Sequence, residues 1–95
     1  MTLCLVLHDL PEGGAEAMEA SIWELSESHC MVKGAMLVDT SVSPKYLLSH
    51  IRGALSRAGL EGKLLVTHVT TDVHMSGLDR DIEGWIQGSL KANAD

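Results

Sequence analysis

Short apolar runs and segments with helical periodicity alternate along the chain. Residues 2–9, TLCLVLHD, hold an uninterrupted apolar run, which is typical of a strand buried on both faces. Pro11, Gly13 and Gly14 then interrupt the pattern. From Ala15 onward, Met18, Ile22 and Leu25 recur at helical spacing with glutamates between them. The first forty residues therefore begin with a buried strand and an amphipathic helix.

A hairpin and a second helix are expected next. The segments CMVK (30–33) and AMLVD (35–39) read as short strands, and Gly34 between them suits a tight turn. Ser43 followed by Pro44 has the pattern of a helix N-cap with proline at the first helical position. Gly59 suits the C-terminal end of that helix. The sequence predicts a helix over about Pro44 to Ala58.

The last third of the chain predicts one more strand and one more helix. KLLVTHVTT, residues 63–71, is rich in leucine, valine and threonine, as strands are. Ser76 and Asp79 have the spacing of a capping box ahead of the apolar positions Leu78, Ile82, Trp85, Ile86 and Leu90. Residues 93–95 are expected to fray.

This order of elements predicts an α+β fold: a ferredoxin-like β-α-β-β-α-β sandwich with an added C-terminal helix. Ninety-five residues suit one domain, here 1–95. The expected spatial order of the strands is four, one, three, two. Right-handed crossovers are expected to place strands one and three side by side and parallel.

Both faces of the central strands carry apolar side chains, yet the first two helices can cover only one of them. Leu3, Leu5 and Leu7 share one face of the first strand, while Cys4 and Val6 share the other. A large uncovered apolar face is unusual for a monomer. We therefore expect a homodimer, with Cys4, Val6 and the tryptophan Trp23 at the protein interface. The alternative is that the C-terminal helix folds back and covers the second face alone.

Charge and composition narrow the classes of partner. The formal net charge is −6, and residues 1–32 contain six acidic residues and no lysine or arginine. Phosphate binding needs clustered cations, so nucleic-acid binding is doubtful. The acidic first helix instead favours a basic protein partner. No stretch approaches the roughly 20 apolar residues of a membrane span, and two cysteines in apolar runs are expected to be free, which fits the cytoplasm.

Three features together resemble the small Cas-two-like proteins, in particular their SinR-like branch. They are the first strand ending in His8-Asp9, the β-α-β-β-α-β frame, and the run KLLVTHVTTDVHMSGLDRDIEGWI, and the resemblance spans about residues 3–90. It implies a dimer of ferredoxin-like protomers, which in CRISPR-adaptation members is a structural subunit that holds DNA together with an integrase. Some members are metal-dependent nucleases whose metal ligand is the aspartate ending the first strand, and Asp9 matches it. The sequence departs from that pattern in its sparse basic residues and acidic first helix.

Candidate chemistry concentrates at strand ends. If strands one and three are parallel, Asp9 and Asp39 end at the same edge, where two carboxylates suit a divalent cation such as Mg²⁺ or Mn²⁺. Equally, acidic residues commonly just end a strand. His8 is a potential general base, but strand alternation points it away from Asp9.

Another cluster, His68, Asp72 and His74, has ligand types that suit zinc but no established zinc spacing. The alternative for these residues is a solvated strand end. Because the fourth strand is expected to run antiparallel to the first, this cluster is predicted at the opposite edge of the sheet from Asp9.

The favoured function is a small homodimeric, non-catalytic interaction or assembly module of the Cas-two-like type, for which no cofactor is expected. One alternative is a metal-dependent nuclease that uses Asp9 as its catalytic residue. Another is a structural subunit that holds nucleic acid through Lys45, Arg52 and Arg57 on the second helix.

Overall fold

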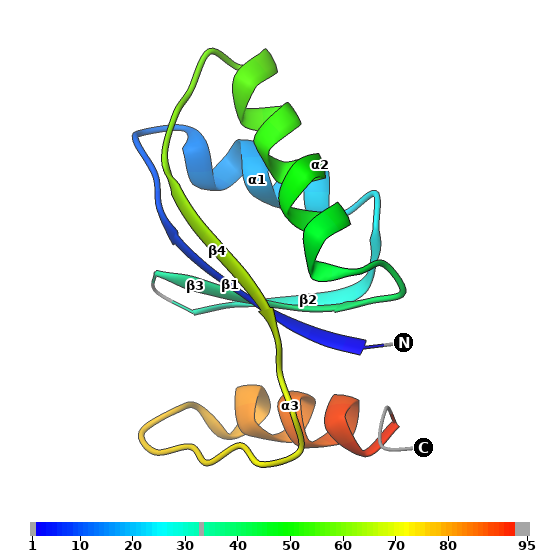
Figure 1. Ribbon diagram of the computed structural model, residues 1–95. Coiled ribbons are helices and arrows are strands. Elements are labelled where there is room, and N and C mark those ends of the chain that lie inside the picture. The colour runs from blue at the N-terminus through cyan, green and yellow to red at the C-terminus, as the bar shows by residue number, and fades with distance from the viewer. Residues whose placement is uncertain (1, 33, 93–95) are drawn as a thin grey trace.

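Four strands and three helices make up the described part of the chain, in the predicted order (Figure 1). The structure is a computed structural model that describes residues 2–32 and 34–92, so the predicted strand end at Lys33 and the predicted fraying of 93–95 lie outside it. None of the described helices is long and apolar enough to cross a bilayer. The elements are β1 (Thr2–Asp9), α1 (Gly14–Ile22), β2 (Ser26–Val32), β3 (Ala35–Thr40), α2 (Pro44–Arg57), β4 (Lys63–His68) and α3 (Arg80–Ala92).

The strands form one open antiparallel sheet in the order β2-β3-β1-β4, so the predicted spatial order is confirmed. The predicted parallel pairing of the first and third strands is wrong, because β1 and β3 are antiparallel, with Thr2 opposite Thr40 and Leu7 opposite Ala35. After β1, helix α1 carries the chain back, so that β2 runs in the same direction as β1. The hairpin at Gly34, whose φ is 77°, then reverses the chain into β3.

The main core lies between one face of the sheet and the pair of helices α1 and α2. Even-numbered residues of β1 and β3 point into it, because side chains alternate along a strand. Cys4 and Val6 are both 0% exposed there. The prediction that these two residues lie at a protein interface is therefore wrong, since the chain's own helices cover them. The other core residues are Met18, Ile22, Met36, Val38, Leu47, Ile51 and Leu55.

Local sequence signals set the ends of α2. The Ser43 hydroxyl accepts a hydrogen bond from the Tyr46 backbone N–H at 3.1 Å, and Pro44 occupies the first helical position. Gly59 follows the helix with a φ of 73°, a left-handed conformation that glycine adopts without strain. The predicted range, about Pro44 to Ala58, is confirmed.

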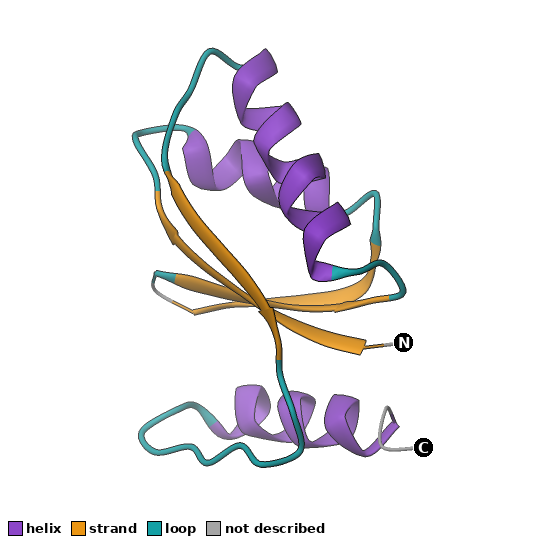
Figure 2. Ribbon diagram, viewed as in Figure 1, coloured by secondary structure: helices purple, strands orange, loops and turns teal. Residues whose placement is uncertain are grey.

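Helix α3 lies on the other face of the sheet, opposite α1 and α2 (Figure 2). It begins at Arg80 and not at the predicted capping box, and the Asp79 carbonyl accepts the first helical hydrogen bond from Glu83. Leu3 and Ile86 are buried at this contact. The helix leaves Leu7 and Leu65 exposed on the same face, so it covers only part of the second apolar surface.

Candidate functional site

A shallow hollow lies at the uncovered end of the α3 side of the sheet. The end of β1, the β2–β3 turn and the start of β4 meet there and enclose about 260 Å³. Two of its leucines, Leu7 and Leu65, are 44% and 52% exposed. Side chains of this size are usually buried, so this end of the sheet presents an apolar pair to solvent. The lining residues are Leu7, His8, Asp9, Gly34, Lys63, Leu64 and Leu65.

Strand register arranges the hollow as two matched pairs. Leu7 of β1 lies directly opposite Leu65 of β4, and Asp9 lies opposite Lys63. Residues that are opposite each other in an antiparallel pair point to the same face, so all four side chains share the α3 side of the sheet. The hollow therefore combines an apolar pair with a carboxylate and an ammonium group at its rim.

The structure places Asp9 and Asp39 at opposite ends of the sheet. Asp39 lies opposite Leu3, near the start of β1, whereas Asp9 ends that strand. The antiparallel pairing of β1 and β3 causes this separation, and it overturns the prediction of a shared carboxylate site for a divalent cation within one chain. Among the described residues, no group of three or more His, Cys, Asp or Glu side chains is arranged to hold a metal ion.

Asp39 instead connects the sheet to α3. Its Oδ2 accepts a hydrogen bond from the Ser89 hydroxyl at 3.1 Å. Its Oδ1 is buried and has no hydrogen-bond partner among the described residues. A buried carboxylate is costly unless it is hydrogen-bonded, so the Ser89 hydroxyl helps to hold α3 in place.

His8 and the histidines near the end of β4 do not converge on Asp9. His8 has the even parity of the core side of β1, and its buried Nε2 has no hydrogen-bond partner among the described residues. His68 lies opposite Cys4, close to the start of β1. His74 Nε2 lies 2.9 Å from Asp72 Oδ1, and both side chains are almost fully exposed. The pair is solvated, as the alternative interpretation of this segment predicts.

The three predicted nucleic-acid contacts lie on α2, and all three are exposed. Arg52 lines a groove between α2 and the start of β4, whereas Arg57 lines a separate hollow together with Tyr46 and His50. Lys45 lines neither of these depressions. The cations thus share one helix but do not converge on one cavity.

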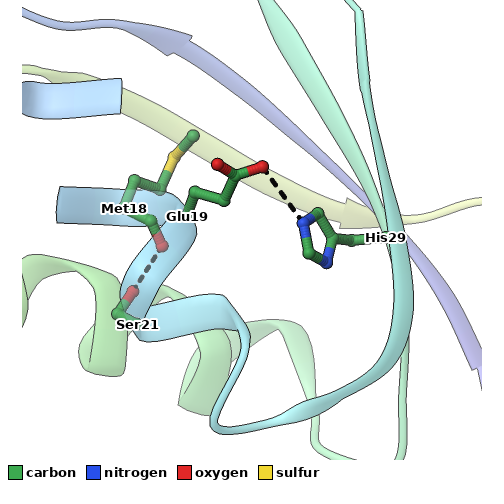
Figure 3. A network of polar contacts seen from close by, with 4 residues as sticks. All are labelled: Met18, Glu19, Ser21 and His29. Carbon is green, nitrogen blue, oxygen red and sulfur yellow. Dashed lines mark hydrogen bonds and ion pairs between the residues drawn. The ribbon is translucent and has the colours of Figure 1, made fainter. Parts of the chain in front are cut away.

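Trp23 lies at the end of α1 and is 65% exposed, which leaves it accessible as predicted for a protein contact. Its ring meets His29 of β2 edge-on, with centroids 4.6 Å apart. His29 Nε2 lies 3.2 Å from Glu19 Oε2, and because a carboxylate only accepts, Nε2 carries the proton (Figure 3). The same view shows Ser21 donating to the Met18 carbonyl at 2.7 Å. The contact with Glu19 orients the His29 ring on which Trp23 packs.

Sequence reasoning missed Leu7 and Leu65 as the exposed apolar pair. The signal was present in β4, where the odd positions Lys63 and Thr67 are polar while the even positions Leu64 and Val66 are apolar. Polar neighbours identify the odd face as the accessible one. The register pairs odd residues of β1 with odd residues of β4. The accessible face therefore includes Leu7, whereas Cys4 and Val6 lie on the core face.

Comparisons of this chain with protein-family models, curated proteins and solved structures found no match.

Proposed function

We propose that the protein is a homodimeric, non-catalytic interaction module that pairs with a second copy of itself through the uncovered end of its sheet. The observation that carries the proposal is the exposed pair Leu7 and Leu65, which lies on the central strand and its neighbour beyond the reach of α3. Burying a leucine side chain contributes about 1.5–3 kcal/mol, and a symmetric interface gains that contribution twice. The apolar pair thus gives this surface a driving force for association.

The position of α3 limits how a second copy can pack on this face. A two-fold axis along the strands would lay the partner's sheet on α3, which covers the other end of the same face. An axis that runs across β1 and β4 at the level of Leu7 and Leu65, which lie opposite each other, avoids this overlap because it carries the two α3 helices to opposite ends of the interface. It lays Leu7 against the partner's Leu7 and Leu65 against the partner's Leu65. The apolar pair is therefore complementary to itself, as a two-fold interface requires.

This arrangement also bears on the nuclease alternative. Within each chain Asp9 lies opposite Lys63, and in the proposed dimer the two Asp9 residues lie on opposite sides of the axis and do not meet. A metal site made of paired Asp9 carboxylates needs a different axis. We therefore propose no catalytic role for Asp9 and no metal cofactor.

The element order and the β2-β3-β1-β4 sheet support a ferredoxin-like arrangement, and the proposed dimer agrees with the resemblance to Cas-two-like proteins. In such a dimer α1 and Trp23 stay accessible on the opposite side of the sheet, where a basic protein partner remains a prediction. Cys4 and Cys30 are free thiols, which suits a reducing compartment such as the cytoplasm.

Leu65→Lys tests the proposal. We expect the wild-type chain to sediment as a dimer and the variant to dissociate, with a loss of about 2 kcal/mol or more because the charge enters the interface twice. Sedimentation equilibrium over a range of concentrations measures the change. Tyr46→Lys is the matched control, since Tyr46 is also an exposed large side chain but lies on α2. A wild-type monomer at every concentration, or equal effects of the two substitutions, contradicts the proposal.

A further inference from the structure

The outer edge of β4 has backbone groups that no strand pairs. β4 is the last strand of the sheet on its side. Just beyond it, the Val69 N–H donates to the Leu3 carbonyl at 2.8 Å, which sets the alternation of the β1–β4 ladder. Lys63, Leu65 and Thr67 therefore direct their backbone groups toward β1, while Leu64 and Val66 direct theirs outward. An exposed strand edge of this kind is a template for another strand.

A groove runs beside this edge. It has a volume of about 670 Å³ and lies between α2 and the start of β4. Leu60 and Leu64 give it apolar lining, Arg52 of α2 gives it a cation, and Glu61 of the connection before β4 also lines it. Among the described residues, Arg52 makes no ion pair. Helix α2 carries Lys45, Arg52 and Arg57 but no acidic residue, although the whole chain has a net charge of −6.

We propose that the free edge of β4 binds an extended, acidic peptide segment of a partner protein, which adds to the sheet as a fifth strand. Its backbone pairs with the outward groups of Leu64 and Val66. Successive side chains of the added strand alternate, so one set faces α2 and the other lies beside Leu65. A carboxylate on the α2 side meets Arg52, and an apolar side chain on the other side packs against the flank of the half-exposed Leu65 that faces away from β1. The proposal does not depend on the dimer.

Two other occupants fit the groove less well. A second β4 strand paired edge to edge brings two α2 helices together, and each has basic residues with no acidic ones, so they repel. A nucleic acid lacks the alternating N–H and C=O groups that a strand edge pairs with. Its phosphates also need several clustered cations, and of the three on α2 only Arg52 lines this groove, since Arg57 lies in a different hollow and Lys45 lines neither.

The probe is a capped, fluorescein-labelled peptide of seven residues in which valine and glutamate alternate, titrated by fluorescence anisotropy. We expect binding that slows hydrogen exchange of the Leu64 and Val66 amides, measured by NMR, since Leu65 and Thr67 are already paired with β1. Replacing the glutamates with lysines, or methylating the peptide nitrogens that face β4, should abolish binding. Arg52→Glu should weaken it about tenfold, which corresponds to about 1.4 kcal/mol. Arg57→Glu, the matched control, should change it little.

Val66→Pro gives a second test of the strand edge. It removes an N–H that points away from β1, so the sheet keeps its own hydrogen bonds, and circular dichroism checks that the variant folds. Peptide binding should be lost. No binding at about 1 mM peptide overturns the proposal, as does binding that is insensitive to Arg52→Glu and to N-methylation. Protection of the same amides by single-stranded RNA, or by a second copy of the chain, without any effect of the peptide also overturns it.

Discussion

His8 and Asp9 are neighbours in sequence but lie on opposite faces of β1. The period of two along a strand assigns His8 to the core side and Asp9 to the accessible hollow. The same period separates the buried Cys4 from the adjacent Leu5. At this scale a residue's role follows from its parity in the strand more than from its type. Parity also buries Cys4, which is 0% exposed, so that the folded state disfavours the charged thiolate.

Burial makes the stability of the fold depend on pH through Cys4. Desolvation raises the pKa of the Cys4 thiol above its ordinary value of 9.0, and a hydrogen bond with Thr2 offsets part of the rise. Below pH 9 the thiol is protonated in both states and stability is unaffected. Above pH 9 the unfolded chain ionises while the folded chain stays protonated, so the free energy of unfolding falls as pH rises, by at most about 1.4 kcal/mol per pH unit.

Urea unfolding between pH 7 and pH 10 measures this decline. Cys4→Ala should lower stability at every pH, because it leaves a cavity, but should flatten the fall above pH 9. Cys30→Ala is the comparison: burial also raises the pKa of that thiol, but Cys30 is only half-buried, so the slope should change less. If the free energy of unfolding falls equally steeply above pH 9 for wild type and Cys4→Ala, groups other than Cys4 cause the loss of stability.

Helix α3 has few side chains buried against the rest of the molecule. Among those described, Ile86 and Ser89 are buried, and the Ser89 hydroxyl donates a hydrogen bond to Asp39 Oδ2 at 3.1 Å. An eleven-residue connection, 69–79, joins it to β4. Few buried contacts mean that an element opens at a lower free energy than the core does. We therefore expect α3 to open at a lower free energy than α1 and α2 do.

Ile86→Ala tests how α3 is held. Truncating a buried isoleucine costs about 2–5 kcal/mol, and the cost should fall on the docking of α3. We expect faster hydrogen exchange confined to residues 80–92, and a red shift of the emission from Trp85, which α3 carries half-buried. Gln87→Ala is the control, since Gln87 is the exposed neighbour. Equally faster exchange in β1 and β3 contradicts a separate opening of α3.

How far the sequence predicts each element depends on whether the signal is local. Ser43, Pro44 and Gly59 act within one helix turn, so the ends of α2 follow from them. The strand order follows from short connections. The direction of β3 was predicted wrongly although the predicted elements imply it, since the α1 crossover leaves β2 parallel to β1 and the hairpin at Gly34 then makes β3 antiparallel to both. The side on which Cys4 lies depends on which face the helices cover, and this is not encoded near Cys4.

In the molecule as a whole, helices lie on both sides of the sheet but cover its two faces unequally. Helices α1 and α2 close one face completely over Cys4 and Val6, whereas α3 closes only one end of the other (Figure 2). The remaining end carries the apolar pair and the opposite charges, and the β4 edge adjoins it. Two binding surfaces can therefore exist side by side: a face for a second copy and an edge for an added strand.

Opposite charges at Leu7 test the two-fold arrangement of the proposed dimer. Leu7→Lys and Leu7→Asp each place a charge where the axis brings the two copies of this residue together. Each variant alone should dimerise at least about tenfold more weakly, because like charges meet at the axis. An equimolar mixture should form heterodimers, in which the lysine faces the aspartate, and high salt should weaken that preference. Native mass spectrometry of the mixture counts the species. A statistical mixture, or homodimers as tight as wild type, means that the two copies of Leu7 do not meet across the interface.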